Sequence, residues 1–203
     1  MPSSQRNNQF QKGSIPNANT KQLRGETTPP LTLSQVLLRH RQLIILGEAG
    51  GGKSTTLQYI ALQFAKGSTI ESMELHETRV PVLIPLRAYA TRIAEDGLMS
   101  AIASAFSELA NISVEHARTF IQQWQDDGKL IVLLDGLDEL PANQQKETIT
   151  NALRIYHDRA RQKGNRLVAS SRLTGYTPFS SSLAEFILTP FEDDGDIFPY
   201  VLR

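Results

Sequence analysis

Residues 47–54 combine glycines, a lysine and a serine at a spacing that suits phosphate binding: they read GEAGGGKS and match G-x-x-x-x-G-K-[ST], the pattern known as Walker A. Because glycine has no Cβ, backbone N–H groups can approach the phosphates closely, and the chain can adopt positive φ. Lys53 can reach the β- and γ-phosphates with its charge, and the Ser54 hydroxyl can ligate Mg²⁺. The loop therefore predicts a site for a nucleoside triphosphate and Mg²⁺. The residues that we expect to bind the nucleotide are Gly47, Glu48, Ala49, Gly50, Gly51, Gly52, Lys53, Ser54 and Thr55.

A second group of chemically active residues follows an apolar run. Residues 130–134 are all apolar and Asp135 comes next, which is the pattern called Walker B. A carboxylate at the end of a buried strand beside the glycine loop is well placed to bind Mg²⁺ through a water molecule. Gly136 leaves room beside the metal, and two further acids follow at Asp138 and Glu139. This segment therefore predicts the metal side of the same site.

Hydrolysis of a triphosphate needs a general base that activates a water molecule near the γ-phosphate. Either Asp138 or Glu139 can fill that role while the other supports the site, and the residues alone do not decide between them. The simpler alternative is that one of the two acids caps a helix beginning near Pro141.

Strands and helices alternate around these motifs. Strands are predicted at residues 43–46, 79–86, 129–134, 166–170 and 185–188. Residues 55–66, directly after the glycine loop, have apolar side chains at helical spacing. A strand, a glycine loop and a helix in this order disfavour the alternative of a glycine-rich turn with a chance lysine. Pro81 and Pro85 place the second strand at a sheet edge, since neither can donate an N–H to a neighbouring strand.

The alternation predicts an α/β fold of three layers, in which helices cover both faces of a parallel sheet. Ligands of such sheets bind at the carboxyl ends of the strands. The glycine loop, Asp135 and the pair Ser171-Arg172 each follow a predicted strand. We therefore expect these three groups to meet at one edge of the sheet and to form the nucleotide site.

Composition narrows the class of protein. The chain has 203 residues, enough for one α/β domain with a full core, and its 21 basic side chains equal its 21 acidic ones. This balance gives no indication of nucleic-acid or membrane binding. The absence of cysteine excludes disulfides, thiolate zinc sites and a cysteine nucleophile. With no long apolar run and no export signal, the sequence predicts a cytoplasmic protein.

Residues 1–30 are rich in Ser, Asn, Gln, Thr, Gly and Pro, with few apolar side chains among them. Such a segment cannot bury enough apolar surface to offset the entropy lost on ordering, so we predict a flexible arm or linker. An alternative for its last residues, 27–30, is that they border the nucleotide base.

A long helix is predicted at residues 141–163, and basic residues cluster near its end. These residues are Arg154, Arg159, Arg161, Lys163 and Arg166. Positive charge complements the dipole at a helix C-terminus, so we expect these side chains to form a solvated face. The alternative is a site for a phosphate group or a partner.

Together the two motifs resemble those of the NACHT domain, a branch of the STAND class of signal-transducing ATPases. The resemblance is carried by residues 47–57 and by residues 133–140, in which a small residue and then an acidic pair follow the aspartate. Weaker matches are at residues 81–87, 169–172 and 188–191. The similar region extends from about Leu31 to Phe191, so the N-terminal arm is outside it.

The resemblance implies a P-loop NTPase fold with a five-stranded parallel sheet in the order 5-1-4-3-2, and a nucleotide-binding domain over residues 31–191. It also implies that Arg172 reads the γ-phosphate, a catalytic role that suits a permanently charged side chain with several donors. The alternative for Arg172 is an ordinary surface arginine after a strand. Residues 192–203 are expected to begin a truncated helical subdomain, because members of the family continue into further domains.

These observations predict an ATP-binding, slowly hydrolysing, Mg²⁺-dependent switch domain that controls signalling or oligomerisation of a larger protein. Its partners would be the nucleotide, other domains of that protein and further copies of itself. We favour ATP over GTP because the chain has no Asn-Lys-x-Asp motif for guanine. Two alternatives stay open: a P-loop phosphotransferase acting on a small molecule, and a scaffold that binds nucleotide without hydrolysing it.

Overall fold

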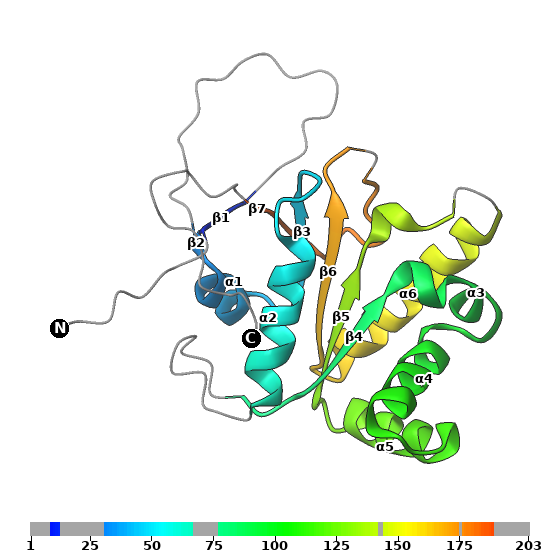
Figure 1. Cartoon of the computed structure of the whole chain (residues 1–203). Helices are drawn as coiled ribbons and strands as arrows, with labels where there is room; N and C mark the ends of the chain where they lie inside the picture. The colour runs from blue at the N-terminus through cyan, green and yellow to red at the C-terminus, as the bar shows by residue number, and fades with distance from the viewer. Residues whose placement is uncertain (1–8, 13–30, 67–76, 142–143, 175, 189–203) are drawn as a thin grey trace, which may run out of the picture.

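A computed structural model describes residues 9–12, 31–66, 77–141, 144–174 and 176–188 (Figure 1). Its centre is a seven-stranded sheet with the strand order β2-β1-β7-β3-β6-β5-β4. The parallel part of the sheet consists of β7 (Ala184–Leu188), β3 (Gln42–Gly47), β6 (Arg166–Arg172), β5 (Leu130–Asp135) and β4 (Val80–Pro85). The five-stranded parallel sheet, in the order that the resemblance implied, is therefore confirmed.

Two short strands extend the sheet beyond β7. β1 (Gln9–Lys12) pairs antiparallel with β7, and β2 (Leu31–Thr32) pairs antiparallel with β1. The sequence did not predict either strand. Apart from β1, residues 1–30 are outside the described residues, and so are residues 192–203. The arm, its contact with a nucleotide base and the helical subdomain therefore stay predictions.

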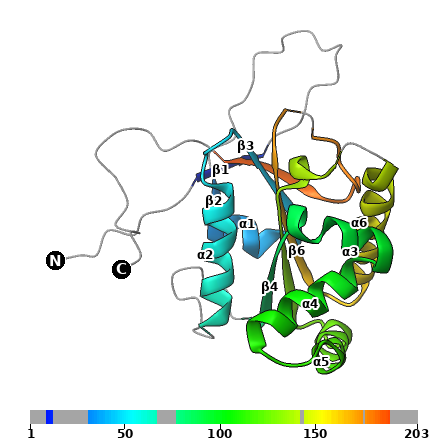
Figure 2. The ribbon, with the colours of Figure 1, turned by 45° about the vertical axis from the view of Figure 1, so that its right-hand side comes forward.

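Helices cover both faces of the sheet (Figures 1 and 2). One face is covered by α1 (Leu33–Arg39) and α2 (Lys53–Ala65). The other face is covered by α3 (Leu86–Asp96), α4 (Leu98–Ala110), α5 (Val114–Asp126) and α6 (Gln144–Gln162). A short 3₁₀ helix, η1 (Leu137–Glu139), follows β5 almost directly. Within the described ranges, every helix is too short or too polar to cross a membrane.

Strand β3 explains why the layers form. Ile44 and Leu46 belong to the core beneath α3–α6, whereas Leu43 and Ile45 belong to the core beneath α1 and α2. All four side chains are fully buried, which is the pattern of a central parallel strand. β4 is the last strand of the sheet, as its two prolines predicted.

At the amino ends of the strands, Glu77 forms ion pairs with two buried arginines. Its Oε2 accepts a hydrogen bond from Arg166 Nε at 2.9 Å and one from Arg79 Nε at 2.6 Å. Arg166 is only 2% exposed, so the prediction that it belongs to a solvated basic face is wrong. The reason is that the strand which Arg166 begins, β6, is central in the sheet and that Glu77 supplies the counter-charge for the buried guanidinium. Burial by itself raises the pKa of Glu77, but the hydrogen bonds from the two arginines outweigh it and lower the pKa to about 2.

Candidate functional site

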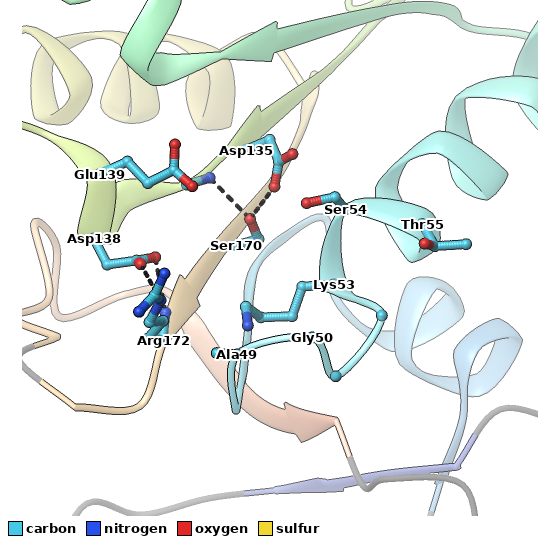
Figure 3. A pocket seen from close by; sticks show the side chains of 13 residues that line it. Ala49, Gly50, Lys53, Ser54, Thr55, Asp135, Asp138, Glu139, Ser170 and Arg172 are labelled. Carbon is cyan, nitrogen blue, oxygen red and sulfur yellow. Dashed lines mark hydrogen bonds and ion pairs between the residues drawn. The ribbon is translucent and has the colours of Figure 1, made fainter.

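The carboxyl ends of three adjacent strands bring the predicted groups together. Gly47 at the end of β3 pairs with Arg172 at the end of β6, and Asp135 ends β5 on the other side of β6. The last residues of β5 and β6, together with the segments that follow β3 and β5, line one cavity of about 260 Å³ (Figure 3). Its walls are formed by Ala49, Gly50, Gly51, Gly52, Lys53, Ser54, Thr55, Asp135, Gly136, Asp138, Glu139, Ser170 and Arg172.

The glycine loop has backbone angles that suit glycine alone. φ is +73° at Gly50 and +84° at Gly52, which is the N-cap of α2. A Cβ on Gly51 would lie 3.1 Å from the main-chain oxygen of Glu48, the same oxygen that accepts the Gly51 N–H. The loop leads directly into the N-terminus of a 13-residue helix, where free N–H groups and the helix dipole favour an anion.

Lys53 is the first residue of α2, and its side chain turns back to the loop (Figure 3). Its Nζ donates to the main-chain oxygens of Gly47 at 2.9 Å and Glu48 at 2.7 Å. Gly47 and Glu48 therefore hold the ammonium group and do not line the cavity, unlike the other residues predicted to bind the nucleotide. Ser54 and Thr55 line the cavity from the first turn of α2.

Ser170 is a residue of the site that the sequence analysis missed. Its hydroxyl donates to Asp135 Oδ1 at 2.6 Å and accepts the Gly136 N–H at 3.0 Å (Figure 3). These two bonds orient the carboxylate and hold the turn after it, in which Gly136 has φ +83°. What identifies Ser170 is the parallel register of β5 and β6. Leu134 pairs with Ala169, so the next residues of the two strands, Asp135 and Ser170, lie side by side.

The two acids of η1 have different surroundings. The Asp138 side chain is 15% exposed; its Oδ1 accepts a hydrogen bond from Arg172 N at 2.9 Å, and its Oδ2 forms an ion pair with Arg172 Nε at 2.9 Å. Glu139 is exposed, and its side chain fills the room beside Gly136, where a Cβ would lie 3.2 Å from Glu139 Cδ. In the part of the chain that the structure describes, no ion pair or hydrogen bond engages the Glu139 carboxylate.

Residues 41–197 match the family model of the NACHT domain. The match covers most of the chain and includes the glycine loop, β5 with the acids after it, and Arg172. The chain belongs to the NACHT family. The resemblance that the two motifs indicated is therefore confirmed. Membership of the family implies a nucleotide-binding NTPase of the P-loop type. No curated protein matches the chain.

The oxygen donors of the NACHT cavity fit Mg²⁺. This ion prefers oxygen ligands, keeps several waters and is held in nucleotide sites by one or two side chains together with phosphate groups. The cavity offers the Ser54 hydroxyl from α2 and the Asp135 carboxylate from β5 (Figure 3). No group of three or more His, Cys, Asp or Glu side chains able to hold a metal occurs among the described residues. The donor set therefore suits a metal that arrives with a phosphate ligand.

Proposed function

We propose that this NACHT domain is a Mg²⁺-dependent switch that binds ATP and hydrolyses it slowly. The observation that carries the proposal is the convergence of the bare glycine loop, the Asp135 carboxylate and the Arg172 guanidinium on one cavity. A triphosphate needs amide donors for its oxygens, an acid for its metal ion and a cation near its γ-phosphate. The cavity offers each of these from a different strand end, which supports a nucleotide as its ligand.

In the proposed complex, N–H groups of the loop and of the first turn of α2 bind phosphate oxygens. Lys53 exchanges the carbonyl oxygens of Gly47 and Glu48 for phosphate oxygens, and the negative charge of the new acceptors favours the exchange. Ser54 and Asp135 would hold Mg²⁺ together with the phosphates. The ion would supply positive charge that neutralises the charge developing on the phosphate oxygens.

Of the two acids in η1, we assign the general base to Glu139. Asp138 already accepts the main-chain N–H of Arg172 and forms an ion pair with Arg172 Nε, so both of its carboxylate oxygens are engaged. Glu139 lines the same cavity and is exposed, so its carboxylate can reach a water molecule beside the γ-phosphate. Arg172 contacts the γ-phosphate from the end of β6.

Hydrolysis removes the phosphate that Arg172 contacts, and the domain therefore has two states with different contacts at one edge of the sheet. We propose that these states control other domains of a larger protein, or the association of several copies of it. Membership of the NACHT family supports a switch of this kind. We favour ATP over GTP because the sequence has no Asn-Lys-x-Asp motif for guanine, and we propose a cytoplasmic location because it has no cysteine.

Two measurements, phosphate release and melting temperature, separate this proposal from its two alternatives. Release of phosphate from ATP without any added acceptor supports hydrolysis and contradicts a phosphotransferase. A melting temperature that rises with Mg-ATP, with no phosphate released over hours, supports a non-hydrolysing scaffold and contradicts the role of Glu139.

The variant Lys53→Ala tests the nucleotide site directly. It removes the cation that we place on the β- and γ-phosphates, so the affinity for Mg-ATP measured by calorimetry should fall by roughly a hundredfold or more. Lys66→Ala is the matched control, because Lys66 is an exposed lysine at the other end of α2. Equal ATP affinity in the Lys53→Ala and wild-type proteins refutes the assignment of this cavity.

A further inference from the structure

Asp138 is bound to Arg172 at two points, and this pairing carries an inference that rests on the proposed function. Oδ1 of Asp138 accepts the main-chain N–H of Arg172 at 2.9 Å, and Oδ2 forms an ion pair with Arg172 Nε at 2.9 Å (Figure 3). One carboxylate therefore holds the backbone and the side chain of the same residue. The hydrogen bond fixes the end of β6, and the ion pair sets the direction of the guanidinium.

The two partners differ in exposure. The Arg172 side chain is 56% exposed, whereas that of Asp138 is 15% exposed. A long exposed side chain samples many rotamers and loses that freedom when it binds a ligand. Asp138 belongs to η1, whose turn is closed by a hydrogen bond from Glu139 N to Gly136 O at 3.0 Å. The acid is therefore the anchored partner, and it restrains the arginine.

The guanidinium faces Asp138 with Nε. Across the described ranges, no hydrogen bond engages the two Nη groups of Arg172, which are the donors able to bind two phosphate oxygens together. If Asp138 held the Nη groups, that pair would have to break before phosphate could bind. The observed pairing leaves those donors available, so Asp138 supports the arginine and does not compete with the phosphate.

We propose that Asp138 is a positioning residue that holds Arg172 in the orientation in which it recognises the third phosphate, and that it thereby sets the preference of the site for ATP over ADP. ADP lacks the phosphate that Arg172 contacts. Loss of the positioning therefore weakens the binding of a triphosphate and leaves the binding of ADP nearly unchanged.

The preference is measured by calorimetry as the ratio of the Kd for Mg-ADP to the Kd for Mg-AMP-PNP, a non-hydrolysable ATP analogue. Loss of a charge-assisted hydrogen bond lowers affinity roughly 10- to 100-fold. We expect Arg172→Ala and Asp138→Ala each to lower the ratio by about tenfold or more, and the double variant to lower it no further than Arg172→Ala does. Asp138→Asn keeps an acceptor for the main-chain N–H but loses the charge, so its ratio should fall by less.

The matched control is Asp127→Asn, which removes the acid of an exposed ion pair with Lys129 at the opposite edge of the sheet and should leave the ratio unchanged. An unchanged or increased ratio in both Asp138 variants overturns the proposal, even where both nucleotides bind more weakly. Additive losses in the double variant overturn it as well, because the two residues would then act separately. A wild-type protein that binds neither nucleotide overturns the proposed function itself.

Discussion

Replacing Ser170 with alanine should weaken the binding of Mg²⁺ more than that of the nucleotide. Ser170 is 1% exposed, and its hydroxyl donates to Asp135 Oδ1 at 2.6 Å. A hydrogen bond to a charged group contributes about 1.5–3 kcal/mol, and loss of a group that orients a metal ligand lowers metal affinity roughly 10- to 100-fold. Because Asp135 would lose this orientation, the Mg²⁺ concentration at half-saturation should rise by roughly the same factor.

The assay is a Mg²⁺ titration of the protein in the presence of AMP-PNP, with nucleotide binding as the readout. Ser171→Ala is the matched control, since Ser171 is the next residue of β6 and is also 1% exposed. Its hydroxyl has no hydrogen-bond partner among the described residues, so its removal should leave the Mg²⁺ requirement unchanged. Ser170→Ala also leaves the buried N–H of Gly136 without its acceptor, which should lower the free energy of unfolding by about 1–3 kcal/mol.

An equal Mg²⁺ requirement in wild type and Ser170→Ala refutes this reasoning, because the serine would then have no influence on metal binding by the Asp135 carboxylate that we propose. Equal increases in the two serine variants refute it too, since of the two serines only Ser170 is hydrogen-bonded to Asp135. A separate chemical-denaturation curve for each variant shows whether any change in the titration comes from unfolding.

Two further predictions concern the base and the buried ion pairs. Glu139→Gln should lower the rate of phosphate release in a single-turnover assay by roughly 10²–10⁴-fold while ATP still binds. Glu77→Gln leaves Arg79 and Arg166 buried opposite a neutral group and should lower the free energy of unfolding by roughly 3 kcal/mol, measured in urea. The folded-state pKa of Glu77, about 2, is below its ordinary value of 4.5, so its contribution to stability is complete above pH 4.5 and is lost as the pH falls toward 2.

The controls for these predictions use the same assays. Wild-type hydrolysis by Glu139→Gln would return the role of base to Asp138. Glu77→Gln should lack the part of the acid dependence that belongs to Glu77, so its unfolding free energy should change less than that of wild type between pH 4.5 and 2. If both proteins lose stability equally over that range, the ion pairs do not stabilise the fold as argued.

The sequence by itself determined the features that depend on near neighbours in the chain. Glycines at 50–52 allow the positive φ values of the loop, and the apolar run before Asp135 forms a fully buried strand. The two prolines of β4 indicated a sheet edge, because the loss of an N–H is a property of the residue itself. The order of the parallel strands was available only through the resemblance to a family, since hydrophobic periodicity carries no information on which strands pair.

Only the tertiary structure decided which distant residues share a contact. Ser170 orients Asp135 because two strands that are far apart in the sequence run side by side in register. Arg166 reads as part of a basic face, but it is buried because Glu77, 89 positions away, supplies its counter-charge. The different roles that we propose for Asp138 and Glu139 depend likewise on Arg172, which lies at the end of another strand. The sequence shows which chemical groups each position carries, whereas the pairing of distant strands decides which of these groups come into contact.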